Sequence, residues 1–234
     1  MKLYFAVLME LEKANLDNIS QFQYAFRPTR QALDIIFILR NLIEKHIEWQ
    51  LVLPSLFVFD GDLFKAYDTV NHKLGAERLQ RKGLRRCTIA AIFREIRNLQ
   101  STIKADDLIS NPIRRTRSLL QGGPDAPKIF NLILDEDLET FNATCTRNRW
   151  GVQLDSDQYV GILCFADNFW LLATQPAHLE LMAQTWIDQL RSPGWHVPVS
   201  ECSWCTTADD SFDATVKWTA RALHGVGVQR GLKS

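Results

Sequence analysis

Apolar residues with the spacing of an α-helix mark several segments of the chain. The clearest is residues 31–49, where apolar side chains recur every three or four positions, as on one face of a helix. These positions are Leu33, Ile36, Phe37, Leu39, Ile43 and Ile47. Similar spacing predicts further helices over 1–14, over 72–99 with a break at Gly83, over 125–147 and over 178–190. We therefore expect helices to form a large part of the fold.

Shorter apolar runs between these segments predict β-strands. Leu56–Phe59 is rich in aromatic residues and suits a buried strand. Later runs are separated by polar turns and predict strands joined by hairpins, at 152–154, 159–165 and 169–173, with a further short strand at 195–199. Residues 101–119 are expected to be extended and rich in turns. Because helices and strands mix without strict alternation, the pattern favours the α+β class.

The domain organisation is expected to be simple, since no internal repeat and no Gly/Ser linker interrupts the pattern. We expect a helical N-terminal segment at 1–21, one main domain at 22–205 and a weakly patterned C-terminal remnant at 206–234. A chain of 234 residues, 46% of them hydrophobic, can bury a core of this size and is not wholly disordered.

Composition also narrows the compartment. The five cysteines are scattered and odd in number, which argues against a disulfide framework and for a reducing environment. No apolar run approaches the roughly 20 residues of a membrane span, and the N-terminal apolar stretch lacks the pattern of a secretion signal. We therefore expect a soluble intracellular protein, nuclear or cytoplasmic, with no membrane partner.

The charge is neutral overall but unevenly distributed. Lys and Arg number 27, as do Asp and Glu. Residues 1–117 hold 19 basic and 13 acidic side chains, whereas 118–234 hold 8 and 14. The segment Lys73–Arg117 alone carries 12 basic and 4 acidic residues. Such a segment suits a basic face for nucleic acid, although solvated helix surfaces explain any single Arg equally well.

Candidate chemistry concentrates where two apolar strands end in acids. Asp60 and Asp62 follow the strand at 56–59 and share one face of it, because strand side chains alternate. Asp167 lies in a tight turn between two apolar strands. Each acid alone is ordinary turn chemistry. Together, two strand-end carboxylates from separate segments suit a pair of divalent ions about 4 Å apart, acting on phosphates.

Four blocks in order resemble the reverse transcriptases of non-LTR (LINE-type) retrotransposons. The runs are Ala25–Asp34 (AFRPTRQALD), Asp62–Val70 (DLFKAYDTV), Gln121–Asn131 (QGGPDAPKIFN) and Phe165–Asn168 (FADN). They are similar to the family patterns GFRPxRSxxD, DLxKAFDxV, RQGDPLSPxLFN and YADD. The resemblance implies an α+β polymerase palm, an antiparallel sheet packed on helices, with incomplete fingers and no thumb.

The resemblance also implies an activity and roles for individual residues. The activity is RNA-directed DNA synthesis, two-metal nucleotidyl transfer from a dNTP to a DNA primer on an RNA template, with Mg²⁺ or Mn²⁺. Asp62 and Asp167 are the implied catalytic residues, and Leu63 and Asn168 complete the implied metal site. The implied nucleotide-binding residues are Tyr67, Gln121, Gly122 and Arg27. The candidate nucleic-acid contacts are Arg30, Arg114, Arg115 and Arg117. Other domains of a larger retroelement polyprotein are implied partners.

Several positions depart from the family pattern. Asn168 replaces the second acid of the YADD block, so the cluster has one carboxylate fewer, and Asp60 is a candidate for partial compensation. Gly123 replaces an Asp. In the later block, where family members often carry a Lys, residues 200–205 read SECSWC. These departures favour an alternative in which the palm has lost turnover and binds RNA or a protein partner.

Two other readings of the sequence are possible. The run Asp60-Gly61-Asp62 is similar to the DxD strand end of haloacid-dehalogenase-type phosphatases, which have a parallel, doubly wound sheet. Cys202 and Cys205 have the spacing of half a zinc site, with His196 nearby, but a single CxxC pair is weak evidence, and buried thiols explain it better.

Overall fold

The structure, a computed structural model, describes most of the chain. The described residues are 2–97, 100–106, 108–114, 117–119, 126–155, 158–208 and 229–230. They form two compact units, each built from two stretches of sequence. The helical unit contains Met1–Ile19 and Lys65–Glu136, and the sheet unit contains Ser20–Phe64 and Asp137–Ser234. Helix α7 (Ala126–Asn148) begins in the first and ends in the second.

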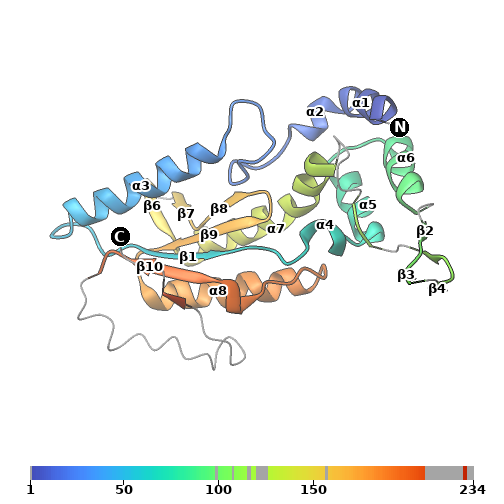
Figure 1. The fold of residues 1–234 in the computed structure, drawn as a ribbon. Helices are drawn as coiled ribbons and strands as arrows, with labels where there is room; N and C mark the ends of the chain where they lie inside the picture. The colour runs from blue at the N-terminus through green and yellow to red at the C-terminus, as the bar shows by residue number, and fades with distance from the viewer. Residues whose placement is uncertain are drawn as a thin grey trace. The chain divides into compact units, whose positions relative to one another are not determined.

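The sheet unit is organised around one central strand. Strand β1 (Phe57–Gly61) lies between β9 (Asn168–Ala173) and β10 (Ser203–Thr206), and both pairings are antiparallel. Strand β8 (Ile162–Phe165) pairs with β9 on one side, and β11 (Gln229–Arg230) joins β10 in parallel on the other. The strand order is β11-β10-β1-β9-β8, shown in Figure 1.

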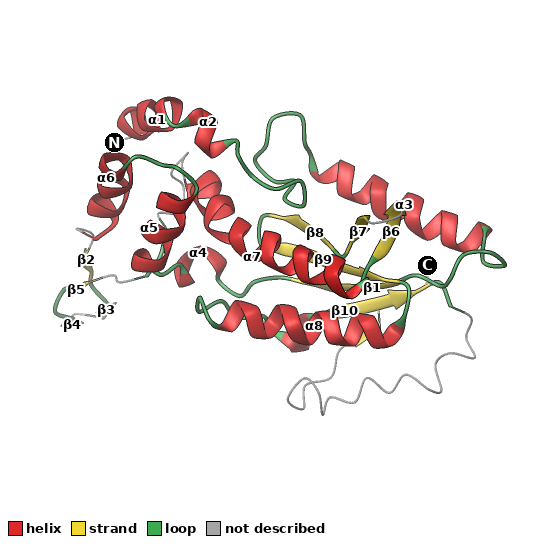
Figure 2. Cartoon of the chain, turned by 180° about the vertical axis from the view of Figure 1, so that it is seen from behind, coloured by secondary structure: helices red, strands yellow, loops and turns green. Residues whose placement is uncertain are grey.

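Helices cover both faces of this sheet (Figures 1 and 2). Helix α3 (Ala32–Glu48) packs on the face that carries Val58 and Leu172. On the opposite face Phe59 stacks on Phe169, with ring centres 6.3 Å apart, and Phe169 meets Trp186 of α8 (Pro176–Arg191) edge-on at 5.8 Å. Strand residues therefore alternate between two apolar layers, as the period of a strand requires. The expected α+β class is confirmed.

Helix α3 forms where the sequence predicts it, but a different side faces the sheet. Leu33, Ile36, Phe37 and Ile47 are more than half exposed. Ile35 is buried, and the packed positions around it are Ile38, Leu39, Leu42 and Ile43. The helix is apolar on most of its circumference, so its period predicts the helix without selecting the side that packs.

The helical unit contains five complete helices among its described residues. These are α1 (Lys2–Leu11), α2 (Lys13–Leu16), α4 (Ala66–Thr69), α5 (His72–Arg81) and α6 (Arg86–Arg97). The break at Gly83, predicted from the sequence, is confirmed, and its φ of +91° is a conformation that suits glycine. The buried Glu12, which follows α1, accepts hydrogen bonds from Arg85 at 2.6 Å and from Thr88 at 2.7 Å. This carboxylate ties the N-terminal helices to α6.

Short ladders follow α6 and α7. Within 100–114, β2 (Gln100–Ser101) pairs with β5 (Ile113–Arg114), and β3 (Lys104–Ala105) pairs with β4 (Leu108–Ile109). The extended conformation expected for this segment is therefore confirmed for its described residues. In the sheet unit, β6 (Val152–Asp155) pairs with β7 (Gln158–Val160) as a separate two-stranded sheet.

Two strand predictions are wrong in detail. The single strand expected at 159–165 is divided at Gly161 into β7 and β8, which pair with different partners. A Cβ on Gly161 would lie 2.6 Å from the Cys145 sulfur, so only glycine fits this approach to α7. The strand expected at 195–199 is an irregular segment leading into the short 3₁₀ helix η1 (Val199–Glu201), and the strand β10 follows it. Within the described ranges, no helix is both long and apolar enough to span a bilayer.

Candidate active site

The chain brings two of the predicted acids together at one end of the central strands. Asp62 follows β1 directly, and Asp167 lies in the two-residue turn that joins β8 to β9. The Leu63 N–H donates to the Asp167 carbonyl at 3.1 Å, and the Phe64 N–H donates to the His196 carbonyl at 2.8 Å. Antiparallel pairing of Gly61 with Phe169 fixes this register. The predicted juxtaposition of the Asp62 segment and the Asp167 turn is therefore present.

The acids at this end of the sheet influence one another electrostatically. Partial burial raises the pKa of the Asp167 carboxyl above 3.8, and the Asp62 charge raises it further. Loss of hydration also raises the pKa of Asp60, with a contribution from Asp62, while a hydrogen bond with Ser203 opposes the shift. The Asp60 residue is exposed, whereas Asp62 and Asp167 are half-buried. Three acids thus share one region in which negative charge is costly.

Gln23 supports the turn that carries Asp167. Its side chain is fully buried, and its Oε1 accepts from the Ala166 N–H at 2.9 Å and the Ala25 N–H at 3.0 Å. Its Nε2 donates to the Ala166 carbonyl at 3.2 Å. Ala166 has a φ of +56°, a left-handed conformation that is unfavourable for a residue with a Cβ. Gln23 therefore holds both polar groups of the residue before Asp167 in place.

Sequence reasoning missed Gln23, although a signal was present. It lies two residues before Ala25, at the end of a polar stretch that has no periodic pattern. A glutamine between the apolar residues Phe22 and Tyr24, both of which are buried, needs internal hydrogen-bond partners. That flanking pattern marks Gln23 as a candidate for an internal structural role.

The oxygen donors at this site suit a hard cation such as Mg²⁺. They are the Asp62 and Asp167 carboxylates, with the Leu63 carbonyl between them in the chain, and the exposed Asn168 amide beside Asp167. Burial and the Asp62 charge both raise the pKa of Asp167, so a bound cation would stabilise the ionised form of this carboxylate. Among the described residues, no three His, Cys, Asp or Glu side chains are grouped to hold one ion. The donor set is thus two carboxylates completed by neutral oxygens.

Among the residues that the structure describes, Cys202 and Cys205 belong to no group of three His, Cys, Asp or Glu side chains that could hold zinc. Cys202 is buried, and desolvation together with nearby Asp62 and Asp60 raises the pKa of its thiol to about 12. Burial raises the pKa of Cys205 as well. Zinc binds the thiolate form, which both environments disfavour. Cys202 instead packs beside Gly61, where an added Cβ would lie 2.9 Å from its sulfur.

The two predicted arginines of the sheet unit have internal partners. Arg27 donates from Nη1 to the Ser20 and Gln23 carbonyls, at 2.5 and 3.2 Å. The guanidinium carbon of Arg30 lies 4.4 Å from the centre of the Tyr24 ring, a cation–π distance. Arg27 thereby supports the segment that contains Gln23, and its expected contact with a nucleotide stays a prediction.

The remaining predicted residues belong to the helical unit. Tyr67 stacks on Phe130 with ring centres 4.8 Å apart, so this aromatic side chain packs within the helical unit. Arg117 is exposed, and its backbone forms an isolated antiparallel β-bridge with Asn71. The backbone of Arg114 lies in β5. Gln121, Gly122 and Arg115 lie outside the described residues. Their roles toward nucleotide and nucleic acid stay predictions.

The family model of reverse transcriptase (RNA-dependent DNA polymerase) matches residues 2–228, nearly the whole chain. The chain belongs to the reverse transcriptase family. Among relatives, it is similar to the "Retrovirus-related Pol polyprotein from type-1 retrotransposable element R2" of Nasonia vitripennis, with 28% identity over 182 residues. That match covers 78% of this chain and 17% of the relative. The predicted resemblance to retrotransposon reverse transcriptases is confirmed.

Solved reverse transcriptases share this fold at low sequence identity. Apo telomerase from Candida tropicalis, truncated from its C-terminal domain, superposes with a TM-score of 0.64 at 10% identity, covering 88% of this chain and 41% of that one. Telomerase from Candida albicans, in complex with a TWJ fragment of telomeric RNA, gives 0.59 at 10% identity, covering 86% and 34%. The sheet unit is thus palm-like, and its antiparallel order excludes the doubly wound phosphatase alternative.

Proposed function

We propose that this chain is the palm-containing part of an enzyme that extends a DNA primer on an RNA template. The observation that carries the proposal is the joining of Asp62 to Asp167 through the Leu63–Asp167 backbone hydrogen bond. It is supported by membership of the reverse transcriptase family. Since the match spans only 17% of its R2 relative, we propose that the chain works within a larger polyprotein.

Asp62 and Asp167 are the proposed catalytic residues. Their carboxylates, with the Leu63 carbonyl and the Asn168 amide, are the oxygens that would hold Mg²⁺ or Mn²⁺. The bound cations supply Lewis-acid stabilisation of the developing charge on the transferred phosphate. The two half-buried carboxylates would fix the position of those cations relative to the strand ends. Gln23 maintains the turn conformation that orients Asp167.

Tyr67, Gln121, Gly122 and Arg27 are proposed to contact the incoming dNTP, by analogy with the family blocks in which they occur. Arg30, Arg114, Arg115 and Arg117 are the proposed contacts to template or primer. These assignments depend on the sequence blocks and on the excess of basic residues in Lys73–Arg117.

Primer extension on poly(rA)/oligo(dT) with Mg²⁺ or Mn²⁺ tests the proposal. Asp62→Asn and Asp167→Asn are each expected to lower incorporation by about 100-fold or more, because each removes several kcal/mol of metal-dependent stabilisation. Asp188→Asn is a matched control, since Asp188 is an exposed acid on α8 paired with Arg191 at 2.7 Å. Equal rates in the parent and both site variants would contradict the assignment.

Metal binding has a readout independent of turnover. Mg²⁺ is expected to raise the melting temperature of the parent and of Asp188→Asn, since a ligand that binds the folded state stabilises it. The same addition is expected to leave the melting temperature of Asp62→Asn and Asp167→Asn almost unchanged. A shift of equal size in all four proteins would show that Mg²⁺ binds elsewhere.

A second function is favoured by the neutral residue Asn168. It lies exposed beside Asp167, where the family pattern has an acid, and contributes no charge to metal binding. If the folded parent incorporates no nucleotide while Asn168→Asp does, the chain is a palm that has lost turnover and retains binding. If both incorporate, Asn168 is sufficient and the polymerase assignment stands.

A further inference from the structure

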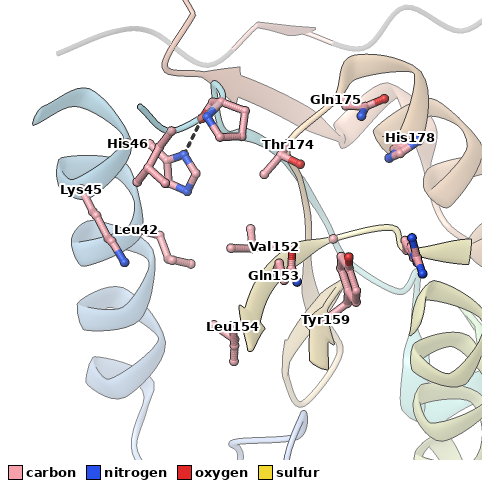
Figure 3. A pocket seen from close by; sticks show the side chains of 14 residues that line it. Leu42, Lys45, His46, Val152, Gln153, Leu154, Tyr159, Thr174, Gln175 and His178 are labelled. Atoms are coloured by element: carbon pink, nitrogen blue, oxygen red, sulfur yellow. Dashed lines mark hydrogen bonds between the residues drawn. The ribbon is translucent and has the colours of Figure 1, made fainter. Parts of the chain in front are cut away.

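Two neighbouring cavities in the sheet unit lie outside the candidate active site. The larger, about 750 Å³, opens between α3, β6 and the start of α8 (Figure 3). Its lining includes Pro54, just before β1, and Thr174, just after β9. Asp62 follows the other end of β1, about 13 Å along the strand at 3.3 Å per residue. The larger cavity therefore lies at the end of the central strands away from the acids.

The smaller cavity adjoins the larger one through shared lining residues. Its volume is about 350 Å³, and its lining includes Arg30, Tyr24 and Leu163 of the edge strand β8. Leu154 and Tyr159, from the β6–β7 hairpin, line both cavities. We call the two together the hairpin tract. It runs from the end of β1 near Phe57 toward the strand that leads into the Asp167 turn.

The charge in the hairpin tract has one sign. Lys45 and Arg149 line the larger cavity and Arg30 the smaller, while none of the described residues that line either cavity is Asp or Glu. Neither Lys45 nor Arg149 forms an ion pair with another described residue. This contrasts with residues 118–234 as a whole, which carry 14 acidic and 8 basic side chains. A concave site with several cations and no acid attracts anions.

Two histidines also line the larger cavity. His46 is 5% exposed, and its Nδ1 donates to the Pro54 carbonyl at 2.6 Å, as Figure 3 shows. His178, in the first turn of α8, lines the same cavity, where the positive end of the helix dipole also favours an anion.

Arg149 is placed in the tract by an unfavourable backbone conformation. It follows α7 directly with a φ of +55°, and its N–H donates to the Thr146 carbonyl at 3.1 Å. This position after a helix is usually glycine, because a Cβ is unfavourable there. Unfavourable backbone conformations occur most often at functional sites, so an arginine in such a conformation beside an open cavity favours a binding role.

The tract also provides aromatic and apolar surface beside the cations. Tyr159, partly exposed, lies between the two cavities, with Leu154 and Leu42 nearby in the lining. Proteins that bind single-stranded nucleic acid combine a cationic groove with aromatic side chains on which bases stack. The hairpin tract has both components, and the volume of its larger cavity, about 750 Å³, lies within the range of sites that hold a small ligand or a nucleotide unit.

We propose that the hairpin tract binds single-stranded nucleic acid, with phosphates at Lys45, Arg149 and Arg30 and a base stacked on Tyr159. This site is separate from the metal-binding acids, so binding there requires neither Asp62 nor a divalent cation.

Fluorescence anisotropy with a labelled oligouridylate of about 15 nucleotides, in EDTA, tests the proposal on the full chain. Lys45→Gln and Arg149→Gln are each expected to weaken binding and to lower the slope of log affinity against log salt by about 1. Arg191→Gln, which removes an exposed charge on α8 that is paired with Asp188, is the matched control. Lys45→Arg keeps the charge and is expected to bind like the parent.

Stacking is tested at Tyr159 with a pair of variants. Tyr159→Ala is expected to weaken binding about tenfold, whereas Tyr159→Phe retains the ring and is expected to bind normally. Asp62→Asn is expected to leave binding unchanged, which separates this site from the proposed polymerase activity. Parent-like affinity in Lys45→Gln, Arg149→Gln and Tyr159→Ala would overturn the proposal. So would full competition by UMP at an equal phosphate concentration, because it would indicate a mononucleotide pocket.

Discussion

At the scale of single residues, the carboxylates that suit metal binding at the candidate site also destabilise the metal-free fold. Asp167 is half-buried beside Asp62, and burial raises the pKa of its carboxyl above 3.8. A raised pKa means that the folded chain binds a proton more tightly than the unfolded chain. The ionised carboxylate therefore destabilises the fold, and this destabilisation is present at neutral pH in the absence of metal.

We predict that Asp167→Asn makes the metal-free protein more stable at pH 7. The free energy of unfolding of the parent should fall as the pH rises from about 4 through the raised pKa, and the variant should lack this fall. Urea denaturation in EDTA at pH 4 and pH 7 measures the free energy of unfolding of the parent and of the variant at each pH. Asp188→Asn, at an exposed and paired acid, is expected to show no gain. A lower stability of Asp167→Asn at pH 7 would contradict the electrostatic argument.

The acids of the site were predictable from sequence, whereas their support was not. Asp62 and Asp167 stand out because each follows an apolar run, and the order of the surrounding blocks identifies the family. Gln23 has no such pattern, and its role depends on Ala166, which is 143 positions away. The apolar residues on either side of Gln23 indicate that its amide has an internal partner, but hydrogen bonds between segments so distant in sequence leave no local pattern that identifies that partner.

At the scale of secondary-structure elements, the spacing of apolar residues predicts whether a segment is a helix or a strand better than it predicts which neighbour the segment packs against. Helix α3 and strand β1 form where expected, yet α3 is apolar around most of its circumference, so the side that packs depends on the neighbouring sheet. Strand β10 is not evident from the sequence, because the run Ser203–Thr206 (SWCT) shows little alternation of polar and apolar residues. Its strand conformation depends on pairing with β1. The division of β7 from β8 depends on the fit of Gly161 against Cys145, which is also a tertiary effect.

Helices α1 and α2 are expected to depend on one buried carboxylate. Burial alone would raise the pKa of Glu12, but hydrogen bonds from Arg85, Thr88 and Asn15 outweigh it and lower the pKa to about 2. The ionised form therefore stabilises the helical unit above about pH 4.5, and this stabilisation is lost as the pH falls toward 2.

We predict that Glu12→Gln lowers the free energy of unfolding at pH 7 by about 1–3 kcal/mol, the usual penalty for breaking buried hydrogen bonds to a charged group. The loss should shrink as the pH falls below about 4.5. Chemical denaturation followed by circular dichroism provides the measurement. Glu10→Gln is the control, because Glu10 is exposed and its ion pair with Lys13 is 3.5 Å long. Equal effects of the two substitutions would show that the Glu12 contacts contribute little.

At the scale of the whole molecule, the two compact units are interleaved in sequence. The chain passes from one unit to the other after Ile19, after Phe64 and within α7 after Glu136. The N-terminal segment contributes Glu12 and the buried side chains Phe5 and Leu16 to the helical unit. Residues 1–19 all belong to the helical unit.

Deletion of residues 2–19 is therefore expected to affect the two units differently. Amide hydrogen exchange should become faster in α5 and α6, which lose the Glu12 contacts and buried apolar partners, whereas amides in β1 and β9 should remain protected. Mass spectrometry of peptides from each unit distinguishes the two. Unchanged exchange in α6, or an equal loss of protection in β1, would contradict the division into separately stabilised units.

The hydrogen bonds between the Gln23 side chain and the Ala166 backbone have a consequence for genetic recombination. The carboxylate turn and the amide that holds it are encoded 143 codons apart, so a recombination event between diverged homologous genes that falls between them separates the two. The hybrid would keep every acid of the site and would lose activity if its residue 23 came from a copy without the amide. Intact acidic motifs are therefore an incomplete guide to which homologous genes encode a correctly held Asp167 turn.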